Sequence, residues 1–173
     1  MATMTLVPDG LAVSSGWAAN SGTIDHALST NNGDTTYAEA GTDTETCTLT
    51  FTAPPVAQVD IDRIISVQFL TYGRYPARGS GGTNVDFEYE TGIASGIGET
   101  INYPNFALHV SRNGTIRTQN IGGSIWSYGN LEGIELKLTK NGAASPDVRI
   151  TMVNLLVTYN EVADDAIFFG HNF

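Results

Sequence analysis

Hydrophobic and polar residues alternate with a period of two through several segments of the chain. The segments TNVDFEYE (83–90), NFALHVSR (105–112) and GIELKLT (133–139) each place an apolar residue at every second position. This pattern predicts strands that turn one face to a core and the other to water, and such strands build antiparallel sheets. The side chains expected on the core face are Val85, Phe87, Tyr89, Phe106, Leu108, Val110, Ile134, Leu136 and Leu138.

Two longer segments also predict strands. IDRIISVQFLTY (61–72) is expected to place Ile65, Val67 and Phe69 on its inner face. In DVRITMVNLLVTY (147–159) the apolar residues change phase between Met152 and Val153. A one-residue slip in a period-two pattern indicates a β-bulge or a bend at that position. Weaker strand candidates are MTLV (4–7), GLAVSS (10–15), TIDHAL (23–28) and TYAEA (36–40).

Turn sequences separate these segments. The stretches RNG (112–114) and KNG (140–142) place Asn-Gly between apolar-patterned segments, which predicts a hairpin at each. No stretch of about 12 residues has a helical period, so no helix is expected. About eight strands in one domain predict an all-β fold, an antiparallel β-sandwich of the jelly-roll type. We expect the domain to cover residues 1–160 and residues 161–173 to form an extended C-terminal tail.

The C-terminal segment NEVADDAIFFGHNF (160–173) combines an acidic pair, Asp164 and Asp165, with an apolar tip. Burying each large apolar side chain contributes about 1.5–3 kcal/mol, and an apolar patch left in water promotes aggregation. The tip is therefore expected to dock on a protein surface. Docking on its own sandwich and docking on a neighbouring subunit or partner are equally favoured. The contact candidates are Ile167, Phe168, Phe169 and Phe173.

Composition and charge indicate a folded protein and exclude some classes of partner. The hydrophobic fraction of 41% is sufficient for a sizeable core. The formal net charge of −10 argues against nucleic acid and anionic membrane surfaces as partners, because both attract basic proteins. The first residues lack a signal-peptide pattern, and no apolar run approaches about 18 residues. We therefore expect a chain that is made in a cytoplasm and does not span a membrane.

The sequence offers little for catalysis or cofactor binding. The single cysteine, Cys47, lies in TCTLTF, where alternation predicts an inert buried thiol rather than a nucleophile or metal ligand. No serine lies in a G-x-S-x-G pattern. Asp86, Glu88 and Glu90 have the spacing of a solvated strand face, which we favour over a glycosidase carboxylate pair. The stretches 31–39 and 41–46 fit polar loops better than calcium sites. We expect no catalytic residue, no metal and no cofactor.

The stretch TYGRYPARGSGGTN (71–84) carries two of the eight Lys and Arg residues, Arg74 and Arg78. A phosphate-binding loop needs its glycines to open a helix, whereas these glycines lead into a predicted strand. Two alternatives remain. The stretch is either a plain connection between strands or a loop that contacts another protein through Arg74, Tyr75 and Arg78, since arginine forms bidentate pairs with carboxylates.

The layout resembles the jelly-roll domains of tailed-phage virion proteins over residues 8–160. The matching features are GWAANSG (16–22), the D-x-x-Y stretch DTTY (34–37), CTLTF (47–51), the proline pair at 54–55, I-x-x-I-x-x-V-x-F (61–69), SIWSYGNLEGIELKL (124–138) and the strand ending at Tyr159. Such domains serve as capsid decoration (cement) proteins, head fibres and tail accessory proteins. The tail beyond residue 160 is not part of the resemblance.

The resemblance implies a non-enzymatic structural protein of the virion. It would bind the assembled capsid and stabilise it as a symmetric homo-oligomer, with a trimer as the first expectation. Its partner would be the major capsid protein or another virion protein, with no role for nucleic acid or a membrane.

The alternative function is that of a carbohydrate-binding or lectin-like β-sandwich, a class that binds sugars on exposed aromatic side chains. The candidate sugar contacts are Trp17, Tyr72, Trp126 and Tyr128. For the two tryptophans the competing interpretation is packing in the core, because each indole buries a large apolar area.

Overall fold

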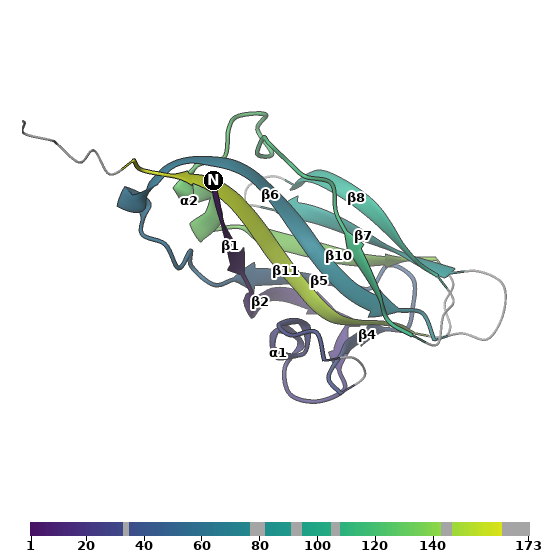
Figure 1. Ribbon diagram of the computed structural model, residues 1–173. Coiled ribbons are helices and arrows are strands. Elements are labelled where there is room, and N and C mark those ends of the chain that lie inside the picture. Colours follow the sequence, from purple (N-terminus) through teal and green to yellow (C-terminus); the bar gives the residue numbers. More distant parts are fainter. Residues whose placement is uncertain (33–34, 77–81, 91–94, 105–107, 143–146, 164–173) are drawn as a thin grey trace, which may run out of the picture.

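The computed structural model describes residues 1–32, 35–76, 82–90, 95–104, 108–142 and 147–163. Its strands form two antiparallel sheets packed face to face, with sheet A in front and sheet B behind in Figure 1. Sheet A contains β1 (Ala2–Leu6), β3 (Ala18–Ala19), β4 (Ala38–Ala40), β6 (Ile61–Arg74), β9 (Val110–Asn113) and β11 (Val148–Glu161). Sheet B contains β2 (Pro8–Ser15), β5 (Thr46–Phe51), β7 (Gly82–Glu90), β8 (Ser95–Pro104) and β10 (Glu135–Asn141). The predicted all-β sandwich is confirmed.

Eight of the eleven described strands follow the jelly-roll order. In sheet A the neighbours are β1-β11-β6-β9, and in sheet B they are β5-β10-β7-β8. Along this series the chain changes sheet at every step except between β7 and β8. The remaining three strands extend the framework, because β2 pairs with β5, and β4 pairs with β11 and β3.

Short helical turns interrupt the strands at α1 (Ile24–Leu28), α2 (Tyr128–Glu132) and the 3-10 turn η1 (Gln58–Asp60). The prediction of a strand at TIDHAL is wrong, because Ile24, Ala27 and Leu28 have helical i, i+3, i+4 spacing and all three are buried. The expectation that the chain has no helix is also wrong at α2. Both helices are five residues long, which is too short to produce a helical period in the sequence.

The period-two alternation predicts the core faces of β7 and β10 correctly. Val85, Phe87 and Tyr89 are buried, as are Leu136 and Leu138 and the residue at 134 just before β10. Three of the weaker segments, MTLV, GLAVSS and TYAEA, contribute to β1, β2 and β4. The alternation marks side chains lying between the two sheets in β1 and β4, whereas in β2 the apolar Leu11 and Val13 are exposed.

The predicted irregularity in the last strand is confirmed by its pairing with β6. The register shifts between Ile150 and Met152, so Thr151 is an extra residue in β11, as in a β-bulge. Thr151 is buried, and the slip leaves Met152 half-buried rather than on the core face. The apolar residues from Val153 onward then alternate inward again.

A second register shift in the same ladder corrects the prediction for the start of β6. The pairing moves between Thr158 and Tyr159, which leaves Ile65 as the extra residue of β6. Ile64 is therefore buried and Ile65 only half-buried, whereas Val67 and Phe69 face the core as predicted.

The segment 105–112 differs from the predicted strand. Residues 105–107, Phe106 among them, lie outside the described residues, and β9 begins only at Val110. Leu108 is 77% exposed and Val110 is half-buried. These side chains are less buried than predicted because β9 is a four-residue strand at the edge of sheet A, where it pairs only with β6 among the described strands.

Neither Asn-Gly sequence makes the predicted hairpin. Strand β10 lies in sheet B, whereas the next strand along the chain, β11, lies in sheet A. After β9 the chain continues beside β6, where Arg117 forms a bridge with Val67. A crossing between sheets after β10, and continued pairing with β6 after β9, therefore decide the path of the chain in place of the local turn preference.

Stacked aromatic rings fill the centre of the core. Phe69 of sheet A stacks on Phe87 of sheet B, with ring centroids 4.7 Å apart, and Tyr89 lies 6.0 Å from Phe69. Trp126 contacts the edge of Tyr89. Gly114 packs against the Phe69 ring, and a β-carbon at this position would overlap it. The glycine is required here because it lets the backbone approach the ring.

Gly114→Ala is expected to destabilise the protein by about 1–3 kcal/mol, because the added methyl group forces the Phe69 ring and its neighbours to shift. Urea unfolding followed by tryptophan fluorescence measures the loss. Gly98→Ala is the matched control, since the nearest atom to its β-carbon would be the Phe87 carbonyl oxygen at 3.8 Å. Equal unfolding midpoints for the two variants would contradict the tight packing of Phe69 on residue 114.

Candidate functional site

The end of β6 that carries Arg74 lies at one end of the sandwich. Arg74 is the last residue of β6 and lies opposite Arg149 of β11 in the ladder. Arg149 donates a hydrogen bond to Glu39 at 3.2 Å, and its guanidinium lies 4.5 Å from the centroid of the Tyr37 ring. This end of sheet A therefore contains a small charged cluster of which the sequence indicated only Arg74.

The other two contact candidates of this loop differ in their environment. Tyr75 is only 5% exposed and belongs to the hydrophobic core, so it offers little surface to a partner. Arg78 lies outside the described residues. Half-buried Arg74 is thus the one member of the predicted set that the described residues place at the surface.

Both tryptophans proposed as sugar contacts lie in the core. Trp17 is 4% exposed and Trp126 is 3% exposed. The Trp17 indole N–H donates to the carbonyl oxygen of Glu45 at 3.1 Å, and the Trp126 indole N–H donates to that of Arg117 at 2.9 Å. An indole enclosed in this way has no free face on which a sugar ring could stack.

The two tyrosines of that set lie nearer the surface but far apart in the fold. Tyr72 on β6 is half-buried and stacks on His109, with 5.5 Å between the ring centroids. Tyr128 begins α2, and its hydroxyl donates to the carbonyl oxygen of Val56 at 3.1 Å. The four aromatic candidates therefore do not gather into one sugar-binding platform.

The opposite end of the sandwich is where the C-terminal tail leaves it. Strand β11 ends at Glu161, and the backbone N–H of Val162 donates to the carbonyl oxygen of Asp60 at 3.0 Å. Contacts with the sandwich therefore continue beyond the predicted boundary at residue 160. The four apolar candidates of the tip, Ile167, Phe168, Phe169 and Phe173, lie outside the described residues, and their docking stays a prediction.

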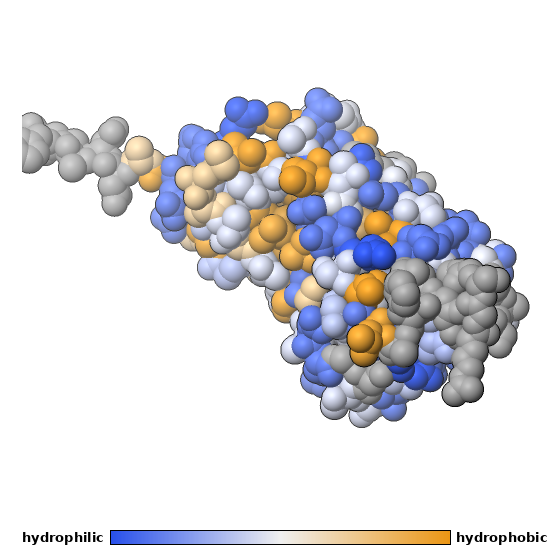
Figure 2. All heavy atoms as spheres, turned by 45° about the vertical axis from the view of Figure 1, so that its right-hand side comes forward, coloured by the Kyte–Doolittle hydropathy of each residue, from blue (hydrophilic) through white to orange (hydrophobic). Residues whose placement is uncertain are grey.

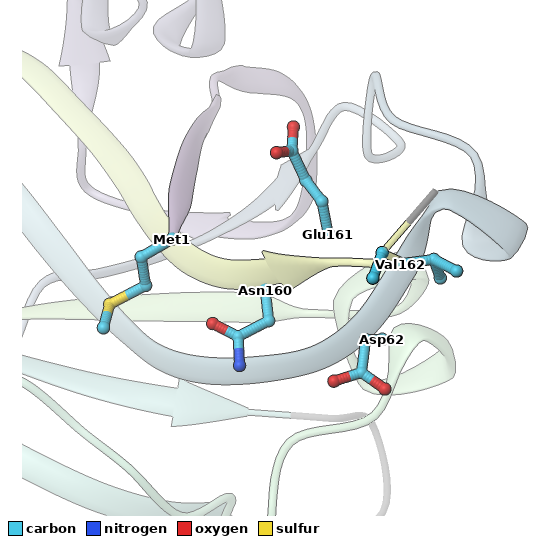
Figure 3. Close-up of a pocket in the computed structure, with 6 residues that line it drawn as sticks. Met1, Asp62, Asn160, Glu161 and Val162 are labelled. Atoms are coloured by element: carbon cyan, nitrogen blue, oxygen red, sulfur yellow. The ribbon is translucent and has the colours of Figure 1, made fainter. Parts of the chain in front are cut away.

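A hollow of about 630 Å³ lies beside this end of β11 (Figure 3). Met1 and Val162 line it together with Asp62, Asn160, Glu161 and Ala163, and Glu161 points to the opposite side of β11 from Asn160. Val59 in the neighbouring turn η1 is 80% exposed and Met1 is 90% exposed. Exposed apolar side chains that gather at one end of the sandwich mark a candidate docking surface.

The carboxylates of β7 lie on the outer face of sheet B with structural partners. Lys137 on β10 lies 3.3 Å from Glu90 and 3.8 Å from Glu88. Asp86 accepts a hydrogen bond from the Thr100 hydroxyl at 2.6 Å. Cross-strand pairs of this kind stabilise a sheet surface, so the geometry favours a solvated strand face over a catalytic carboxylate pair.

The single cysteine, Cys47, also lies in a structural environment. Cys47 is fully buried, and burial raises the pKa of its thiol to about 12, as expected for an inert cysteine. Within the described ranges, no three His, Cys, Asp or Glu side chains gather where they could hold a metal ion. No helix in the same part of the chain is long and apolar enough to cross a membrane.

Comparison with known proteins does not add to these observations. No protein-family model, curated protein or solved structure matches the chain significantly. The function must therefore be argued from the fold and from the residues of this chain.

The sequence did not indicate that Lys140 is buried. It follows Leu138 and Thr139 at the end of β10 and was expected in a turn, yet its side chain is fully buried and its Nζ donates to the carbonyl oxygen of Gly41 at 3.0 Å. The loop 41–45 folds over it, and Glu45 accepts hydrogen bonds from the backbone N–H groups of Gly41 at 2.7 Å and Thr42 at 3.0 Å.

These contacts set the charge state of Glu45. Partial burial acts to raise the pKa of its carboxyl group, but hydrogen bonds from Thr42 and Gly41 and the positive charge of Lys140 act in the other direction. The net effect of burial, the hydrogen bonds and the charge of Lys140 lowers the pKa of Glu45 below its ordinary value of 4.5. A lowered pKa means that the unfolded chain binds more protons here, so this contribution to stability is complete above pH 4.5 and is lost as the pH falls through the folded-state pKa.

Glu45→Gln is therefore expected to lower the free energy of unfolding at pH 7 by about 1 kcal/mol, because the hydrogen bonds to Gly41 and Thr42 lose their charged acceptor. The difference from the unmodified protein should shrink as the pH falls below 4.5. Urea unfolding at a series of pH values measures it. Glu132→Gln, at an exposed position of α2, is the control. A difference that stays constant with pH would contradict the role of the ionised carboxylate.

Proposed function

We propose that this protein is a non-enzymatic structural component of a virus particle, a capsid decoration (cement) protein that binds and stabilises the assembled capsid. The jelly-roll order of its strands is the observation that supports this best, because it agrees with the fold that the phage resemblance implied. The capsid is preferred over a tail or fibre on the strength of that resemblance alone.

The distribution of polar groups supports a structural role. The ionisable groups considered for catalysis have structural environments, since Lys137 pairs with carboxylates of β7 on the sheet surface and the Cys47 thiol is buried. A protein that reinforces a shell needs a rigid body and contact surfaces rather than a reactive cleft. The close-packed aromatic core provides the rigid body.

The proposed partner is the major capsid protein or another virion protein. The outer face of sheet B carries four carboxylates, Asp86, Glu88, Glu90 and Glu135, and one lysine, Lys137, and would suit a basic patch on that partner. The chain would act as a symmetric homo-oligomer, for which the resemblance implies a trimer. Symmetric association fits a component of a symmetric shell.

Immunogold electron microscopy tests the proposal on particles of the virus that encodes the chain. Antibodies against the recombinant protein are expected to label the head surface. Label on the tail or on the fibres would instead assign the protein to that part of the particle. Particles that carry no label, together with binding of the protein on a glycan array, would instead favour a carbohydrate-binding module.

Truncation tests whether the tail contacts the particle. A chain that ends at Ala163 keeps the Val162–Asp60 hydrogen bond and is expected to unfold at the same urea concentration as the full chain. Co-sedimentation with particles lacking the protein should fall, since Ile167, Phe168, Phe169 and Phe173 would no longer contribute about 1.5–3 kcal/mol each. A lowered unfolding midpoint with unchanged co-sedimentation would mean that the tip docks on its own sandwich.

A further inference from the structure

The outer face of sheet A has an unusual composition. Along β11 the core-facing residues are buried, so the alternate residues point outward, and cross-strand partners share that face. The outward residues of β11 between the Thr151 bulge and Asn160 are Met152, Asn154, Leu156 and Thr158. None of these four side chains carries a charge.

The neighbouring strands continue this uncharged surface. The outward residues of β6 paired with those of β11 are Ser66, which is only 8% exposed, and Gln68, Leu70 and Tyr72. On β1 the partners of Leu156 and Thr158 are Thr5 and Thr3. On β9 the partners of Leu70 and Tyr72 are Asn113 and Ser111. The twelve described positions across four strands thus contain no Asp, Glu, Lys or Arg, in a chain of net charge −10.

This face also exposes apolar area. Met152, Leu156 and Leu70 are each half-buried, although no described strand or helix covers the sheet in front of them (Figure 1). Tyr72 is also half-buried, and its ring stacks on His109. Ile116 is 60% exposed, and it lies next to Arg117, whose bridge to core-facing Val67 turns the neighbouring residue outward. Figure 2 shows apolar side chains in orange reaching the surface among paler and blue polar ones on this side of the molecule.

The two outer faces of the sandwich therefore differ in charge. The outer face of sheet B carries the four carboxylates and one lysine already described, whereas the twelve outward positions of β1, β11, β6 and β9 carry no charged side chain. Protein interfaces are depleted of charged residues at their centres, and the twelve positions on sheet A share that feature.

Charge also indicates which partner fits this face. Two copies of a chain with net charge −10 repel each other wherever acidic surfaces meet. A neutral face avoids that repulsion when it meets an identical face. We propose that the outer face of sheet A, formed by β1, β11, β6 and β9, is the contact between two copies of this chain.

This contact specifies the self-association that the proposed function includes, and it gives that association a different symmetry. A surface that meets its own copy forms an isologous contact, which has two-fold symmetry. The assembly is therefore a dimer, or an even-numbered oligomer built from dimers, instead of the trimer that the phage resemblance implies. The contact itself does not depend on whether the protein is found on a virus particle.

Native mass spectrometry and light scattering of the full chain test the symmetry. The expected mass is twice the 18.4 kDa of one chain, or an even multiple of it. Higher salt concentration should strengthen association, because it screens the repulsion between acidic copies. A monomer at every concentration, a trimer, or association that weakens with salt would overturn the proposal.

A matched pair of variants tests the surface. Leu156→Lys places a charge at the centre of the face and should raise the dissociation constant by roughly tenfold or more, since a buried charge needs a partner. Thr139→Lys is the control on the outer face of sheet B, where the new charge lies opposite Asp86. Both positions are half-buried, and circular dichroism shows whether each variant is folded. Equal dissociation constants for the two folded variants would overturn the assignment of the face.

Cross-linking tests the contact without adding charge. Cys47 is buried, so an added surface cysteine is the reactive one. Asn154→Cys should link two chains with a short bifunctional maleimide, whereas Thr139→Cys should not. Equal cross-linking at both sites would overturn the proposed contact. Dimers that cross-link through residue 154 but do not label particles would refute the virion function and leave the contact standing.

Discussion

The stack of Phe69 on Phe87 is the contact on which the arrangement of the two sheets depends. Phe69 belongs to the long strand β6 in sheet A and Phe87 to β7 in sheet B, and their rings lie 16° from parallel. Face-to-face sheets are held about 10 Å apart by the side chains between them, so this pair sets the local spacing. Tyr89 and Trp126 extend the stack, and the Trp126 indole bonds to the segment that follows β9. One aromatic cluster thus orders both the sheets and a connection between them.

The same sandwich presents two chemically different outer faces. Charge pairs between β7 and β10 stabilise the surface of sheet B in water. Sheet A has no comparable pairs among its outward residues between the Arg63–Asn160 and Arg74–Arg149 rows, where Thr, Asn, Leu and Met side chains follow one another. A protein with one acidic outer face and an uncharged stretch on the other can associate through the uncharged stretch. This separation of charge connects the fold to the structural role proposed for it.

The candidate site was only partly predictable from residue types. Arg74 lies at the surface as expected, but Tyr75, Trp17 and Trp126 are core residues, because the ends of a sandwich are closed by large side chains from its loops. Residue type does not distinguish an aromatic that closes a core from one that binds a ligand. Lys140 shows the converse, since a lysine beside an Asn-Gly turn proved to be buried under the loop 41–45.

The residue pattern was sufficient to predict the all-β class, the inward faces of β7 and β10, the buried Cys47 and the slip in β11. These features follow from alternation within a single strand, which is a local property. The pairing of the strands between the two sheets, the helical turn at TIDHAL and the uncharged stretch on the outer face of sheet A depend instead on how distant segments pack together. That face is built from residues 3–5, 66–72, 111–113 and 152–158, which come together only when distant strands pair in register. Each strand contributes only a few uncharged residues, and a continuous neutral surface appears once the four strands lie side by side.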